Sequence, residues 1–89
     1  MKTRFSLGQT VMTRAAFERL PPDEVFAALD RHQSGDWGEL DSEDRKENER
    51  SLLYGGRLLS RYQTKDHTAF WIITETDRLT TTVLLPEEY

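Results

Sequence analysis

Apolar residues recur three to four positions apart in the first half of the chain, which predicts helices. Residues 14–20 and 23–32 show this spacing, and a pair of prolines between them separates two short helices. Thr13 precedes the first helix and has the side chain of a typical N-cap. A third helix is predicted for residues 43–54, although its first eight positions contain no apolar residue, so Leu52, Leu53 and Tyr54 are its expected anchors. The Gly55-Gly56 pair is expected to end it.

Alternating apolar and polar residues dominate the second half and predict strands. Residues 57–64, 69–75 and 79–85 are rich in strand-forming residues and are joined by short polar links, which favours an antiparallel meander. Residues 70–73 are apolar on both alternating faces, so this strand is expected to be central and covered on both sides. Residues 3–12, interrupted at a glycine, are typical of a short strand or hairpin.

These elements predict an α+β fold with an N-terminal strand or hairpin, two to three helices and a C-terminal three-stranded antiparallel meander. At 89 residues the chain is expected to form one small domain, residues 1–89, with a thin core. The helices can cover one face of the sheet. The other face is left to the N-terminal hairpin or to a second subunit, so a homodimer is a possible arrangement.

Composition narrows the functional classes. The chain has no cysteine, which excludes disulfides, thiolate metal sites and a cysteine nucleophile. No apolar run is long enough to span a membrane, and the N-terminus does not look like a secretion signal. We therefore expect a cytoplasmic protein with no cofactor and no membrane partner. Nothing in the sequence is typical of a phosphate-binding loop or a serine triad.

Four stretches carry a resemblance to a known family. HQSGDWGEL (32–40), GRLLSRY (56–62), WIITE (71–75) and TTVLLPEEY (81–89) resemble a family of small bacterial proteins of this length, usually labelled hypothetical or plasmid-related. The resemblance covers about two thirds of the chain. The family has no established activity, so what the resemblance implies is context: a bacterial cytoplasm and an association with mobile genetic elements.

The segment from His32 to Asp44 holds the densest set of candidate chemical groups. Its histidine and carboxylates can in principle bind a hard cation or supply a general acid and base. Capping and helix-dipole interactions explain the same acids and the histidine equally well, and Trp37 has a structural interpretation as a core residue. The spacing matches neither an EF-hand nor a paired-histidine zinc motif, so no metal site is predicted.

Charge is distributed unevenly. Residues 23–49 contain ten acids and three bases, while the overall net charge is only −4, so the remainder of the chain is basic. In the strand predicted for residues 57–64, two arginines share one face and can hold phosphates. This pattern supports the alternative hypothesis of a small metal-independent ribonuclease. Its candidate catalytic residues are His32, Arg57, Arg61, Tyr62, His67 and Thr81. Net acidity counts against it, and pairing of these arginines with the acidic helix is the simpler explanation.

The acidic helix favours a different hypothesis, which we place first. A helix that is polar over two turns is either a solvated face or a docking surface for a basic partner. We therefore predict a non-enzymatic module that binds a macromolecule, either a protein or a nucleic acid. The candidate binding residues are His32, Asp36, Trp37, Glu39, Glu43, Glu47, Glu49 and Arg61.

Overall fold

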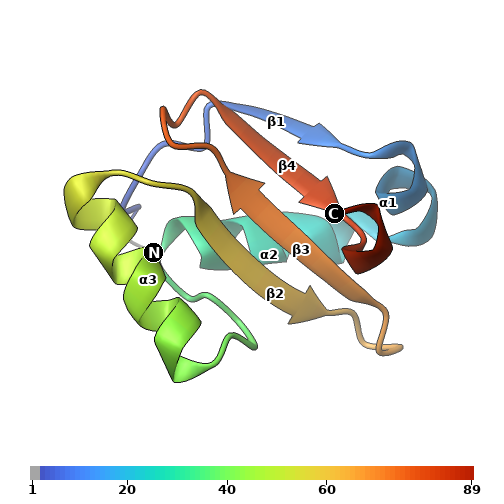
Figure 1. The fold of residues 1–89 in the computed structure, drawn as a ribbon. Helices are drawn as coiled ribbons and strands as arrows, with labels where there is room; N and C mark the ends of the chain where they lie inside the picture. The colour runs from blue at the N-terminus through green and yellow to red at the C-terminus, as the bar shows by residue number, and fades with distance from the viewer. Residues whose placement is uncertain (1–2) are drawn as a thin grey trace.

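Four strands form one mixed sheet in the order β1-β4-β3-β2 (Figure 1). The computed structural model describes residues 3–89. The elements in chain order are β1 (Gln9–Met12), α1 (Arg14–Arg19), α2 (Pro22–Gln33), α3 (Ser42–Tyr54), β2 (Leu58–Gln63), β3 (Ala69–Thr74), β4 (Thr80–Leu84) and a 3-10 turn, η1 (Pro86–Glu88). The fold is α+β, as the sequence predicts.

The predicted meander is confirmed, and the N-terminal segment is a strand that joins the sheet. Strand β3 lies between β2 and β4 and is antiparallel to both. Of the two predicted alternatives for the N-terminal segment, the structure has the single strand β1 and not the hairpin. Strand β1 pairs in parallel with β4, where the Gln9 amide donates to the Leu79 carbonyl and the Thr13 amide to the Val83 carbonyl. Parallel pairing is possible because the long intervening chain returns at β4 in the same direction. The segment therefore widens the sheet instead of covering a face.

The helices begin where their capping residues predict. The Thr13 hydroxyl accepts a hydrogen bond from the Ala16 amide at 3.1 Å, and Asp41 does the same for the Asp44 amide at 2.9 Å. A proline at the first position begins α2, and Gly55 follows the end of α3. None of the helices in residues 3–89 combines the length and apolarity needed to cross a membrane.

The main core lies between α2 and the face of the sheet that α2 covers, here called the inner face (Figure 1). Alternation along the strands directs Leu58, Tyr62, Phe70, Ile72 and Val83 to this side, and all five are nearly inaccessible to solvent. The opposite side, here called the outer face, has no α-helix lying across it within the described chain (Figure 1). Helix α3 instead lies beside the β2 edge.

Helix α3 is held by one of its apolar residues and by polar contacts. Of the three predicted anchors, Leu52 is partly buried and packs against the cluster of Trp37, Leu40 and Leu58, whereas Leu53 is 76% exposed and Tyr54 82% exposed. The buried residues of this helix are Asn48 and Ser51. Asn48 donates to the Leu59 carbonyl at 2.7 Å and accepts from the Leu59 amide at 3.1 Å. Its side-chain amide thus pairs with β2 as a neighbouring strand does.

Candidate binding face

The sheet separates the residues that the ribonuclease hypothesis requires to act together. His32 and Thr81 are fully buried on the inner-face side. Arg61 belongs to the alternate positions of β2 and lies on the outer face, over Trp71. Arg57 lies by Tyr89 and is exposed. No single cleft within the described chain therefore joins these histidine and arginine side chains.

His32 is the centre of a buried hydrogen-bond chain. Its Nδ1 lies 2.6 Å from the Ser60 hydroxyl and its Nε2 lies 2.9 Å from the Thr74 hydroxyl. Thr74 in turn contacts the Thr81 hydroxyl at 2.7 Å, and Thr81 donates to the Leu7 carbonyl. Burial, helped by the charge of Arg78, lowers the pKa of His32 to about 3. His32 is therefore neutral at physiological pH and ties α2 to three strands.

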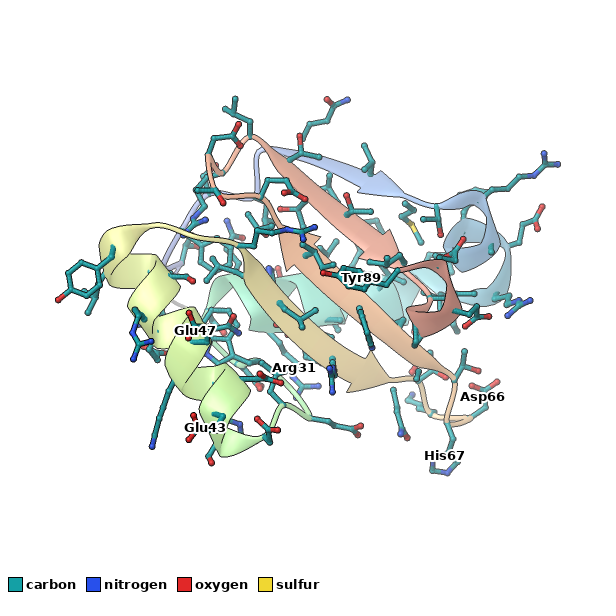
Figure 2. All side chains as sticks on the ribbon, viewed as in Figure 1. Arg31, Glu43, Glu47, Asp66, His67 and Tyr89 are labelled. Atoms are coloured by element: carbon teal, nitrogen blue, oxygen red, sulfur yellow. The ribbon has the colours of Figure 1, made fainter. Side chains whose placement is uncertain are left out.

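The other two titratable candidates lie apart from each other. Tyr62 is buried and its hydroxyl donates to the Asp36 carbonyl at 2.6 Å. Burial raises the pKa of this phenol, so it stays protonated. His67 is exposed in the turn between β2 and β3, where its Nδ1 lies 3.3 Å from Gln63 (Figure 2). Within residues 3–89, the buried Tyr62 and the exposed His67 therefore do not form an acid and base pair.

The loop between α2 and α3 uses its acids to hold its own shape. Arg31 donates to Asp36 at 2.8 Å and, through this hydrogen bond, lowers the pKa of that carboxyl. Trp37 is 4% exposed and its indole N–H donates to Glu49 at 3.0 Å. Glu39 is exposed and its amide donates to the Arg61 carbonyl. No cluster of three or more His, Asp or Glu side chains suited to a metal ion occurs within residues 3–89.

Glu49 is structural, unlike the other acids predicted on α3. It pairs with Arg4 at 2.9 Å as well as with Trp37, and the hydrogen bond from Arg4 is the main reason that its pKa is lowered. Glu43 and Glu47 are exposed on α3 beside the sheet (Figure 2), and Glu47 pairs with Arg50 at 3.2 Å. Glu43 and Glu47 are here called the acidic surface of α3; the same helix also exposes the bases Arg45, Lys46 and Arg50.

Two arginines and two aromatic rings form a continuous row on the outer face, here called the arginine–aromatic row. The Arg61 guanidinium lies 4.9 Å from the centre of the Trp71 ring, directly across the β2–β3 pair. The Trp71 and Tyr89 rings are 5.2 Å apart, and Arg57 lies 5.9 Å from the Tyr89 ring. Tyr89 lies in front of the sheet in Figure 2 and is 68% exposed. Arginines and aromatic rings in contact are common in recognition surfaces.

The two arginines of the row differ in their partners. Arg57 forms a salt bridge with Glu75 at 3.2 Å and donates to the Tyr89 hydroxyl at 3.3 Å. The pairing of Arg57 with α3 that the sequence favours is therefore wrong. Arg61 has no salt bridge within residues 3–89, and its Nε is buried without a hydrogen-bond partner there. The guanidinium of Arg61, which has no carboxylate partner in this part of the chain, is therefore able to pair with an added anionic or carbonyl oxygen.

Arg61 is a candidate that the sequence predicts, whereas Trp71 is not. For Tyr89 the sequence leaves two roles open, packing back on the sheet or presenting its ring to a partner, and the structure packs it against Trp71. Alternation along β3 was the available signal, because it places Trp71 on the side opposite Phe70 and Ile72. The position of Tyr89 depends on η1, which turns the last residues back over the sheet.

Comparisons of this chain with protein-family models, curated proteins and solved structures find no match.

Proposed function

We propose that this protein is a non-enzymatic binding module that recognises a protein partner through the arginine–aromatic row and the acidic surface of α3. The observation that carries the proposal is Arg61, whose guanidinium lies over Trp71 without a salt-bridge partner in the described chain, on a face without a covering α-helix. An acidic or carbonyl group of a partner can pair with this guanidinium, and the rings supply apolar contact area.

A protein fits this composite surface better than a nucleic acid does. Acids and bases are interspersed on the helix that borders β2, where Glu47 pairs with Arg50, so a phosphate chain that crosses the row meets no continuous positive surface there. Glu75 already neutralises Arg57, and the net charge of the chain is −4. A protein can oppose both signs at once, with acids placed at Arg61 and bases placed at α3.

The resemblance to plasmid-related bacterial proteins adds a context to the proposal. We infer that the partner is a protein that acts on mobile genetic elements in the bacterial cytoplasm. The acidic surface of α3 suits a basic partner, as many proteins that handle nucleic acids are.

The test compares matched truncations in capture from bacterial lysate. Arg61→Ala removes the guanidinium of the row, whereas Arg14→Ala removes an arginine that is 91% exposed on α1. A double Glu43→Gln and Glu47→Gln variant removes the acidic surface with almost no change in shape. Glu49 is left intact because its substitution disturbs Arg4 and Trp37.

We expect the wild-type protein and Arg14→Ala to retain the same partner. Arg61→Ala and the double glutamine variant should each weaken its binding at least about tenfold, the loss of a single good charged contact. Labelled single-stranded RNA and DNA serve as competitors and should not displace the partner. Equal capture by Arg61→Ala and Arg14→Ala, or displacement by the nucleic acids, argues against the proposal.

A further inference from the structure

Strand β1 leaves one side of its backbone unpaired. It is the last strand of the sheet, and the amides of Gln9 and Thr13 point toward β4. Backbone direction alternates along a strand, so the N–H and C=O groups of Thr10 and Met12 point away from the sheet. No strand in the described part of the chain pairs with this side.

The opposite edge of the same sheet is closed. Asn48 bonds both backbone groups of Leu59, and the Trp37 carbonyl and Glu39 amide bond the backbone of Arg61. Strand β1 has no such cover. Its sequence, Gln-Thr-Val-Met, contains no charge and no proline, which are the usual protections of a free edge.

An apolar groove runs along the free edge of β1. It has a volume of about 280 Å³ and is bordered by Met12 from the strand and by residues of α1 and α2. Phe17 and Phe26 line it although they are 72% and 68% exposed. None of its lining residues is charged. Two exposed phenylalanines beside an unpaired strand indicate a surface that binds another protein surface.

We propose that a second copy of this chain covers this edge, with the two β1 strands antiparallel about a two-fold axis at Val11. In this register Thr10 of one copy faces Met12 of the other, and these pairs exchange the outward N–H and C=O bonds. Val11 faces Val11 of the second copy on the outer face. Registers centred on Thr10 or Met12 are poorer, because they place an outward residue opposite Gly8 or Arg14, beyond the strand.

Charge and apolar area both fit a second copy. No charged residue faces its own copy in this register, so the axis brings no like charges together. Arg14 faces Gly8 of the second copy, which packs against the backbone of Arg78 and Leu79. Specific dimers bury roughly 800 Å² per partner, more than a four-residue strand supplies. The groove with Phe17 and Phe26 provides the additional apolar area.

The register can be tested by disulfide trapping, because the chain has no cysteine. The two Val11 positions form a non-hydrogen-bonded pair with Cα atoms about 4.5 Å apart, within the range that a disulfide bridges. The control is Gln9→Cys, on the same face of the same strand. Its two copies lie four residues apart along the strand, roughly 13 Å, which is too far for a disulfide. We expect Val11→Cys to give a covalent dimer under mild oxidation and Gln9→Cys to remain uncrosslinked.

Sedimentation of the protein tests the pairing itself. We expect the wild type to be a dimer at about 100 μM. Thr10→Pro removes only an N–H that points out of the sheet, which an edge strand tolerates, and should weaken dimerisation at least tenfold, whereas Thr10→Ser should not. Circular dichroism checks that both variants fold. If Thr10→Pro does not fold, the crosslinking of Val11→Cys compared with Gln9→Cys still tests the proposal. A monomeric wild type, which leaves the edge to a foreign strand, or equal crosslinking of both cysteine variants overturns the proposal.

Discussion

His32 has a different role in the fold from the one that the sequence suggests. In the sequence it is a candidate base near several acids, and in the fold it is a fully buried connector between α2 and the hydroxyls of Ser60 and Thr74. Both ring nitrogens have partners, so the side chain is satisfied without a charge. Its role is stability, and that role depends on pH.

We predict that His32 makes the protein less stable as the pH falls below about 6.5. Its pKa is about 3 in the fold and 6.5 in the unfolded chain, so the unfolded state binds more protons between these values. The free energy of unfolding then falls with decreasing pH by at most about 1.4 kcal/mol per unit. Urea unfolding at pH 7, 6 and 5 measures the slope. Carboxylates add their own losses only at lower pH, where the lowered pKa values of Asp36 and Glu49 begin to matter.

His32→Gln is the matched variant for this prediction. Glutamine can donate and accept at the same site but does not titrate, so its unfolding free energy should be nearly flat from pH 7 to pH 5. The same slope in the wild type and in His32→Gln would assign the pH dependence to another group.

Gly38 supports a second prediction at the scale of one residue. It has φ +75°, and a Cβ atom there would collide with the Arg61 carbonyl and lie 2.8 Å from the Tyr62 ring. We expect Gly38→Ala to lower the free energy of unfolding by more than about 2 kcal/mol. Gly55→Ala is the control, since φ is also positive but nothing lies within 4 Å. Equal losses in chemical denaturation would attribute the whole effect to backbone strain.

At the scale of elements, the ends of α3 follow from local sequence, whereas its position against the sheet depends on contacts with β2. Its cap at Asp41 and its end at Gly55 are readable from the sequence. The position of α3 cannot be read from the sequence, because Asn48 is one of several polar residues in a polar run. Only the fold shows that its side chain bonds the backbone of β2. Of the predicted anchors Leu52, Leu53 and Tyr54, Leu52 packs against the core, whereas Leu53 and Tyr54 are exposed.

We predict that Asn48→Ala destabilises the protein by about 2 kcal/mol or more. The substitution leaves the amide and carbonyl of Leu59 without partners at a partly buried edge, which costs more than the loss of a solvated hydrogen bond. Glu47→Ala, one position earlier on an exposed site, should change the unfolding free energy by less than about 0.5 kcal/mol. Similar melting of both variants would show that the β2 edge does not need this cover.

For the whole molecule, the sheet decides which side chains can meet. It places the buried histidine network on one side and the arginine–aromatic row on the other. It also gives the molecule one closed edge and one free edge. Pairing two β1 edges would join two sheets and place two arginine–aromatic rows on one outer face. Such a dimer would present two copies of the recognition surface on one side.

This arrangement predicts no cleavage of RNA. Labelled RNA incubated with the protein in the presence of a chelator should remain intact, as in buffer, because no histidine lies beside Arg57 or Arg61. Arg61→Ala and His32→Ala preparations serve as controls for contaminating nuclease. Cleavage by the wild type that both substitutions abolish would restore the ribonuclease hypothesis.

The sequence by itself determined which segments become helices and strands, that the meander is antiparallel and that residues 70–73 lie at its centre. Capping residues, glycine pairs and alternation act over a few positions, so they are readable locally. Only the tertiary structure decided that β1 pairs in parallel with β4, that Asn48 closes the β2 edge and that Arg61, Trp71 and Tyr89 form one row. These contacts join residues distant in the chain, and no local pattern specifies which distant partners meet.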